Sequence, residues 1–401
     1  MISRLKNILP FLGIYFLVCG ISFVGFSWAM SKERKIISPV EEPQEVPAGG
    51  LAMLFSGPKD QECPINGEMF TKEQATIWEK NRPLLVMIEN HKDSRPQSGL
   101  SRADVVYEAI AEGGITRLMG VYYCRAAAPV ERKYDVGPVR SARTYFLDWA
   151  SEYSQYPLYN HVGGANCSPV SPGGPCTTDT RVRALEQIEQ YGWLDPNHHS
   201  DMNQFALDYK YCRREPERTG ETKATEHTVY CDTSSLWRLA EERNLAGWDK
   251  DFFKPWQFKD DLAKTERGTV NNISFDFWQG YKDYSVIWKY NLETNSYLRE
   301  NGGESHFDFL TQKQIEAKVI VIQFTKETGP VDSHKHMLYG TVGSGKALIF
   351  QDGKVISGIW EKASRTKRTV FKDAQGREVK FNRGQIWIEV LPLGNKVDYE
   401  S

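Results

Sequence analysis

The residues most suited to chemistry gather between Arg82 and Gly164. Polar side chains there follow three apolar runs, at Leu84–Ile88, Val105–Ile110 and Ile115–Tyr123. Stiff apolar runs that alternate with polar loops are how a rigid sheet presents a site. The polar set comprises Glu89, Asn90, His91, Arg95, Gln97, Asp104, Glu108, Glu112, Arg117, Arg140, Arg143 and His161. The segment therefore predicts where a site lies and which charges it carries, but it names no reaction.

Five of these residues are predicted to bind an anionic ligand. They are Arg95, Arg117, Arg140, Arg143 and His91. Arg140 and Arg143 lie in the sequence VGPVRSAR, directly before a predicted helix. Amide groups at a helix start attract anions, and guanidinium groups can fork around phosphate or carboxylate oxygens. The alternative interpretation is that the arginines pair with neighbouring carboxylates as a structural network.

The catalytic candidates are Asp104, Glu108 and His161. Asp104 and Glu108 are an even number of residues apart, so both side chains would point to one face of a strand. With His91 or His161 nearby, they could supply a general base. We expect the four arginines to converge with Asp104 and His161 on one concave face, where loops from a common sheet edge gather. Whether the chain is an enzyme stays open.

The sequence predicts no metal site and no cofactor. Its eight histidines form no HExxH motif, and no Cys/His spacing matches a zinc site. The sequence GTVGSGK at 340–346 has the spacing of a phosphate loop. However, Ala347 replaces the Ser or Thr that would hold magnesium, and the strand-like run ALIF follows where a helix should begin. We interpret it as a turn between strands.

The polar segment also carries a family resemblance. The sequences ENHxxxRPQSGLSxADVVYEAxxEGGITR and VGPVRSAR are similar to those of the YerB-like family of predicted lipoproteins. The similarity resumes at YNLETNSYLRENGGESHFD and at GKVISGIWEKASRTKRTVFKDAQGREVKFNRGQIWIEVLP. This resemblance implies a two-domain bacterial envelope protein, and the family has no established activity.

A fainter likeness links the segment to the cell-wall polymer ligases of the LytR-CpsA-Psr type. It rests on the order strand, Arg-bearing loop, S-x-A-D, paired strands, P-x-R, helix and N-x-x-GG. Those enzymes hold a lipid pyrophosphate with arginines and acidic residues. The chain departs from them at Ser141, where their P-R-D element has Asp. The likeness implies an anionic cell-wall or lipid-pyrophosphate ligand, with a polymer transferase as one alternative. The other alternative, which does not rest on this likeness, is a non-catalytic envelope interaction protein that binds through its β-rich domain.

The predicted fold class is α+β, with a mixed α/β N-terminal domain followed by an antiparallel β-rich C-terminal domain. Helices are predicted at Thr144–Tyr156 and Thr180–Tyr191, and short strands with Gly-containing turns follow from Val270. We expect Val270–Leu391 to fold alone, because its strands and turns are consecutive. The predicted parts are an anchor at 1–31, a flexible linker at 32–60, an N-terminal domain at 61–248 and a C-terminal domain at 265–395.

The start of the chain predicts attachment to a membrane. Residues 7–31 carry no charge and are long enough for a membrane-spanning helix, which needs about 20 apolar residues. Val18 does not fit a lipobox at Cys19, so we predict an uncleaved single-pass anchor, and the family resemblance places the domains outside the cell. The formal net charge of −2 argues against nucleic-acid binding. The expected partners are the membrane and an anionic cell-wall precursor or envelope protein.

Six cysteines remain outside the predicted anchor, an even number that fits disulfides in an extracytoplasmic protein. They are Cys63, Cys124, Cys167, Cys176, Cys212 and Cys231. We predict one pairing, Cys167 with Cys176, because the Pro- and Gly-rich loop between them favours a tight return and a short loop costs little entropy to close.

Overall fold

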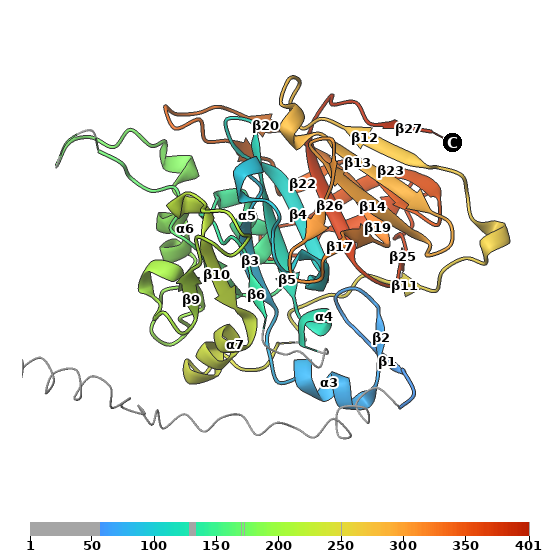
Figure 1. Ribbon diagram of the computed structural model, residues 1–401, viewed down its shortest axis with the longest axis horizontal. Helices are drawn as coiled ribbons and strands as arrows, with labels where there is room; N and C mark the ends of the chain where they lie inside the picture. Colours follow the sequence, from blue (N-terminus) through green and yellow to red (C-terminus); the bar gives the residue numbers. More distant parts are fainter. Residues whose placement is uncertain (1–56, 128–133, 170, 172, 250, 401) are drawn as a thin grey trace, which may run out of the picture. The chain divides into compact units, whose positions relative to one another are not determined.

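The computed structural model describes residues 57–127, 134–169, 171, 173–249 and 251–400 (Figure 1). The predicted anchor at 7–31 and most of the predicted linker at 32–60 lie outside these residues. Within the described ranges, no helix has both the length and the apolar character needed to cross a membrane. The fold is mostly sheet with few helices, which agrees with the coarse α+β prediction.

A ten-stranded mixed sheet runs in the order β24-β23-β22-β19-β26-β4-β5-β3-β7-β8 (Figure 1). The first five strands are Val370–Asp373, Lys354–Lys362, Gly343–Gln351, Val319–Thr325 and Ile386–Pro392. The other five are Val105–Glu112, Ile115–Tyr122, Leu84–Glu89, Leu158–His161 and Asp201–Asn203. Strand β26 is parallel to β19 on one side and to β4 on the other. A strand from the end of the chain therefore joins both halves into one sheet.

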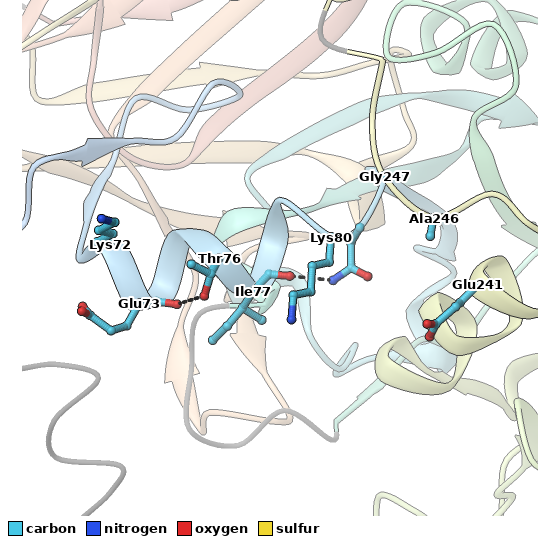
Figure 2. A pocket seen from close by; sticks show the side chains of 9 residues that line it. Lys72, Glu73, Thr76, Ile77, Lys80, Glu241, Ala246 and Gly247 are labelled. Carbon is cyan, nitrogen blue, oxygen red and sulfur yellow. Dashed lines mark hydrogen bonds between the residues drawn. The ribbon is translucent and has the colours of Figure 1, made fainter.

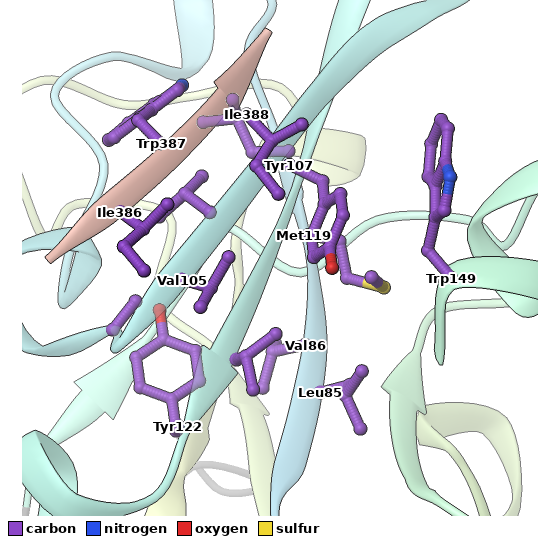
Figure 3. Close-up of a cluster of buried hydrophobic side chains, with 14 of the residues drawn as sticks. Leu85, Val86, Val105, Tyr107, Met119, Tyr122, Trp149, Ile386, Trp387 and Ile388 are labelled. Atoms are coloured by element: carbon purple, nitrogen blue, oxygen red, sulfur yellow. The ribbon is translucent and has the colours of Figure 1, made fainter. Parts of the chain in front are cut away.

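The pairing of β26 with β4 at the centre of the sheet explains why the sequences of the central strands are continuous apolar runs. Strands β3, β4 and β26 are buried along almost their whole length, as expected for a sheet that is covered on both faces. One face packs against helix α5 (Thr144–Ala150), where Tyr107 stacks on Trp149 with ring centroids 5.5 Å apart. Figure 3 shows these rings among the aliphatic side chains of β3, β4 and β26.

A second sheet covers the other face of the junction. Its strands lie in the order β15-β14-β13-β12-β27, with β18 also paired to β14. They span Glu304–Ser305, Ser296–Asn301, Val286–Asn291, Asn272–Phe275, Asp398–Tyr399 and Glu316–Ala317. Trp288 of β13 packs edge-to-face on Trp387 of β26, with ring centroids 5.3 Å apart. The core of the C-terminal half is thus built partly on β26, the strand that also pairs with β4.

The prediction of a purely antiparallel C-terminal domain is wrong at β26, which is parallel to both of its neighbours. Gly-containing turns indicate pairing between consecutive strands. They could not reveal that β26 pairs with β4, which is far away in the sequence. All described residues belong to one compact unit. The domain limits at 61–248 and 265–395 therefore stay predictions.

The remaining α-helices among the described residues are short. They are α3 (Lys72–Trp78), α4 (Cys124–Ala127), α6 (Ala184–Gln190) and α7 (Thr233–Glu242). The small strands are β1 (Gln61–Glu62), β2 (Met69–Phe70), β6 (Asp135–Val136), β9 (Cys212–Arg214), β10 (Val229–Asp232), β11 (Phe258–Lys259), β16 (Phe307–Asp308), β17 (Lys313–Gln314), β20 (Glu327–Thr328), β21 (Leu338–Tyr339) and β25 (Phe381–Asn382). The helix predicted at Thr144–Tyr156 ends earlier, at Ala150. The helix predicted at Thr180–Tyr191 begins with a separate 3-10 turn at Thr180–Val182.

Two sequence interpretations concern loops. The disulfide prediction is confirmed, and the rejection of a phosphate loop at 340–346 is supported, but residues 343–346 are the start of strand β22 rather than a turn. The disulfide Cys167–Cys176 is present, together with Cys63–Cys124 and Cys212–Cys231, so all six cysteines outside the predicted anchor are paired. The phosphate-loop match is not a nucleotide site, because Lys346 lies inside strand β22 rather than at a helix start.

Candidate functional site

Two of the predicted arginines share one carboxylate at the end of β4. Arg117 Nη2 donates to Glu112 Oε1 at 2.7 Å, and Arg143 Nε donates to Glu112 Oε2 at 3.0 Å. Burial favours the neutral acid, but the two arginines outweigh it and hold the pKa of Glu112 well below its usual range. Further donors of both arginines bind main-chain carbonyls, of Ser141 and Ala142. Neither guanidinium group is free for a ligand.

The third arginine lies at the end of β3 and stays open to solvent. Arg140 Nε donates to Glu89 Oε1 at 3.0 Å, and His227 Nδ1 contacts Glu89 Oε2 at 2.8 Å. This hydrogen bond raises the pKa of His227. The Arg140 side chain is 26% exposed, whereas Glu89 is buried. Among the described residues, neither Nη atom of Arg140 has a hydrogen-bond acceptor.

The group around Glu112 and the group around Glu89 lie next to each other across the sheet. Glu89 of β3 and Arg117 of β5 are direct cross-strand partners, with side chains on the same face. Strand β5 follows β4 through the two-residue turn Gly113-Gly114, and both glycines have positive φ, as a tight hairpin requires. The hairpin therefore places Glu112 and Arg117 next to each other, and the sheet places both near Glu89.

Arg95 belongs to another part of the structure. Its Nε donates to Asn90 Oδ1 at 3.2 Å, and its Nη2 donates to the carbonyl of Asp283 at 2.8 Å. The guanidinium carbon lies 5.4 Å from the ring centroid of Tyr284. Arg95 thus ties the loop after β3 to the second sheet and does not join the other three arginines.

Asp104 also lies apart from the arginines. Asp104 precedes β4, at the opposite end of that strand from Glu112. Its carboxylate accepts hydrogen bonds from the main-chain N–H groups of Tyr123 and Arg125, at 2.7 and 3.1 Å. Burial raises the pKa of Asp104 to about 7, against these donors. Its contacts make it an anchor for the chain around the Cys63–Cys124 disulfide.

His161 is fully buried and has partners on both ring nitrogens. Its Nδ1 lies 2.6 Å from the carbonyl of Gly163, and its Nε2 lies 2.7 Å from Asp201 Oδ1. The predicted convergence of all four arginines with Asp104 and His161 is therefore wrong for Arg95 and Asp104. Arg117, Arg140 and Arg143 do come together. His161 lies beside the Arg140 main chain, but its ring is bound to Gly163 and Asp201.

Sequence reasoning missed the residue that completes the open group. His227 lies 138 residues after Glu89, and nothing in its local sequence distinguishes it from an ordinary surface histidine. The ring of His91 stacks on it, with centroids 5.0 Å apart and planes 11° apart. We call Glu89, His91, Asp93, Arg140 and His227 the β3-end cluster. Asp93 is included in the cluster because its main-chain N–H donates to His91 Nδ1 at 3.3 Å.

The third catalytic candidate, Glu108, is part of a charge network buried between the two sheets. Glu108 of β4 and Glu389 of β26 are opposite each other, and Arg299 of β14 donates to Glu108 through Nη2. Arg299 Nη1 also lies 2.7 Å from His306 Nδ1, and Trp288 Nε1 donates to Glu389 at 3.0 Å. The network contains one cation and two carboxyl groups, so burial and the nearby Glu108 raise the pKa of Glu389 well above its usual range.

We expect the substitution Glu389→Gln to change how stability depends on pH. An unfolded Glu loses its proton near pH 4.3, whereas the folded Glu389 keeps it to much higher pH. Its stabilising contribution is therefore complete below about pH 4 and is lost as pH rises, by up to about 1.4 kcal/mol per pH unit. Gln stays neutral, so in thermal melts the variant should gain on the wild type as the pH rises above about 5.

The exposed Glu361 provides the control for this experiment. Glu361→Gln should give a melting-temperature difference from the wild type that stays nearly constant with pH. A wild type that gains stability over Glu389→Gln at high pH would contradict the protonated state of Glu389.

A cleft lined by none of these groups lies elsewhere (Figure 2). It has a volume of about 960 Å³ and lies between helix α3 and the chain that follows α7. Its charged lining consists of Lys72, Lys80, Glu73 and Glu241, so positive and negative side chains balance. None of the predicted site residues lines it. Its lining offers no preference for an ion of either sign.

Comparisons with known proteins agree with this architecture. Residues 69–172 match the family "Protein of unknown function (DUF3048) N-terminal domain", and residues 273–388 match its C-terminal domain. The chain is 25% identical over 376 residues to "Putative lipoprotein YerB" of Bacillus subtilis (strain 168), with 94% of each chain covered. A crystal structure of the YerB protein from Bacillus subtilis has the same fold, with a TM-score of 0.65 and 23% identity. The match covers 85% of this chain and all of that one.

The two family matches together cover more than half of the sequence and fall on the two halves that β26 joins. The resemblance seen in the sequence is thus confirmed over both halves. The chain belongs to the YerB-like family of proteins that carry the DUF3048 domains.

Proposed function

We propose that this chain is a non-catalytic, membrane-attached protein of the bacterial cell envelope that binds an anionic ligand at Arg140. The name of the Bacillus subtilis relative supports attachment to a membrane, since a lipoprotein is held there by its lipid. Three disulfides support a location outside the cytoplasm, where disulfides form and persist. The uncharged segment at 7–31 supports the same attachment.

The contacts of the acid–base candidates favour binding over catalysis. Asp104, Glu108 and His161 are fully buried, and each is held by internal partners. A general base must reach the proton that it abstracts from a bound substrate, either directly or through one water. These three side chains have no such access. The same argument weakens the alternative of a cell-wall polymer transferase.

One observation carries the proposal of anion binding: Arg140 keeps both Nη atoms open at the surface while Glu89 fixes its Nε. A guanidinium group held in this way has lost much of its rotational freedom before a ligand arrives. Its two open N–H groups match the spacing of two phosphate or carboxylate oxygens. Arg117 and Arg143 lack this freedom because Glu112 occupies both.

Titration calorimetry with inorganic pyrophosphate tests the proposal on the full-length chain after EDTA treatment. We expect Arg140→Gln to weaken binding about 10- to 100-fold, because a hydrogen bond to a charged group contributes about 1.5–3 kcal/mol. Arg213→Gln is the matched control, since its side chain is 25% exposed and also pairs with carboxylates. Equal affinities for Arg140→Gln and the wild type would refute the proposal. Absence of binding to the wild type would favour the alternative of a protein-interaction scaffold.

A further inference from the structure

The β3-end cluster gathers two imidazoles, two carboxylates and a single arginine. One ring nitrogen of His91, one of His227 and one carboxylate oxygen of Asp93 lie within 4.8 Å of one another. Glu226 lies close enough to interact electrostatically with both histidines and with Arg140. Imidazole nitrogens with carboxylate oxygens are the ligand set of zinc and similar transition metals.

The hydrogen bonds within the cluster orient His227 as a ligand. Its Nδ1 is bound to Glu89 at 2.8 Å, so Nε2 remains for another partner. Metal-binding histidines almost always donate their other ring N–H to a carboxylate, a backbone carbonyl or water, which fixes the tautomer and the ring. Glu89 is itself held by Arg140 at 3.0 Å, so the supporting carboxylate cannot easily turn away.

To bind one ion together with His227, the His91 ring must turn out of its stacked position, because a metal ion lies in the plane of the imidazole that binds it. Ligands of a tetrahedral zinc ion lie about 3.3 Å apart, given zinc–nitrogen bonds of about 2.0–2.1 Å. His91 is partly exposed and Asp93 is mostly exposed, so both can rotate toward the buried His227. Among the described residues, the other group with ligand atoms at this spacing contains Cys63 and Cys124, which are already joined in a disulfide. His334 belongs to neither group.

We propose that His91, Asp93 and His227 form a binding site for a divalent transition-metal ion of the zinc type, with Glu89 as the positioning residue of His227. The charges of the cluster favour a cation. Glu89, Asp93 and Glu226 carry three negative charges, against one positive charge on Arg140 when both imidazoles are neutral. The site goes beyond the proposed anion binding and does not depend on it.

Zinc chloride titrated against a chromophoric chelator, with the EDTA-treated full-length chain and no anion, tests this site. We expect one zinc ion per chain, and no measurable competition by magnesium chloride at the same concentration, because magnesium prefers oxygen ligands. His91→Ala and His227→Gln should each weaken zinc affinity at least 100-fold, since each removes a direct ligand. Asp93→Asn should weaken it about tenfold.

Two controls show whether a loss of zinc affinity comes from the site itself rather than from unfolding or from the removal of any histidine. His91 and Asp93 lie at the surface, so circular dichroism of these two variants should match the wild type, even if His227→Gln is less stable. His334→Ala should bind zinc like the wild type. Unchanged affinity in His91→Ala, loss of binding in His334→Ala, or no zinc binding by the wild type would each overturn the site. Pyrophosphate binding by the EDTA-treated protein would survive such a failure, so the two proposals can fail separately.

Discussion

The substitution Arg299→Met is expected to lower the free energy of unfolding by about 3–5 kcal/mol, because it leaves a buried carboxylate without its counter-charge. Arg299 and Glu108 are both 0% exposed, and they come from different halves of the family fold. Met fills a similar volume, so the loss reports the charge rather than a cavity. Arg299 also lies over the ring of Trp387, with its guanidinium carbon 4.8 Å from the centroid, and that contact is lost too.

Urea unfolding of the full-length chain, followed by tryptophan fluorescence, measures this effect. Arg377→Gln is the control, because Arg377 pairs with Asp373 but is 75% exposed and should contribute less than about 1 kcal/mol. Combining Arg299→Met with Glu108→Gln should recover part of the loss, since both charges then disappear. A stability change below 1 kcal/mol for Arg299→Met would show that the network is not a structural link between the halves.

The isolated segment 265–395 is expected to lack a cooperative melt, contrary to the independent folding that its turns predict. In the full chain, strand β26 lies between β19 and β4. Without β4, the N–H and C=O groups on one side of β26 lose their partners, and a flat apolar edge strand is exposed. Glu389 and Arg299 also lose the Glu108 carboxylate that completes their network.

Circular dichroism and light scattering of the expressed segment measure this result. We expect β-rich but non-cooperative or aggregating material, and we expect co-expression with residues 57–248 to restore a soluble, cooperative complex. A monomeric segment with a sharp thermal transition would mean that the C-terminal half completes its own sheet. The turn signals would then have described a true domain.

Much of the central sheet could be predicted from the sequence because its strands are long apolar runs. The predicted strands at Leu84–Ile88, Val105–Ile110 and Ile115–Tyr123 lie within one or two residues of β3, β4 and β5. The partners of each strand could not be predicted. Nothing in the sequence of β26 shows that it inserts beside β4, because parallel pairing leaves no local turn as a signal.

The candidate site was predicted in composition but not in geometry. Arg117, Arg140 and Arg143 do come together, since they lie at strand ends and before helix α5. The sequence also suggested that Asp104 and Glu108 share a face, but it could not show that each is bound to a different buried partner. The contact of Glu89 with His227 joins residues that are distant in the chain, and only the folded sheet reveals it.

A crystal structure of the full-length chain with inorganic pyrophosphate tests most directly where the ligand binds. The account predicts pyrophosphate oxygens within 3.2 Å of the Nη atoms of Arg140, with the Arg117–Glu112–Arg143 pairing unchanged. Pyrophosphate in the cleft beside α3, or Arg143 released from Glu112 to meet the ligand, would contradict the account.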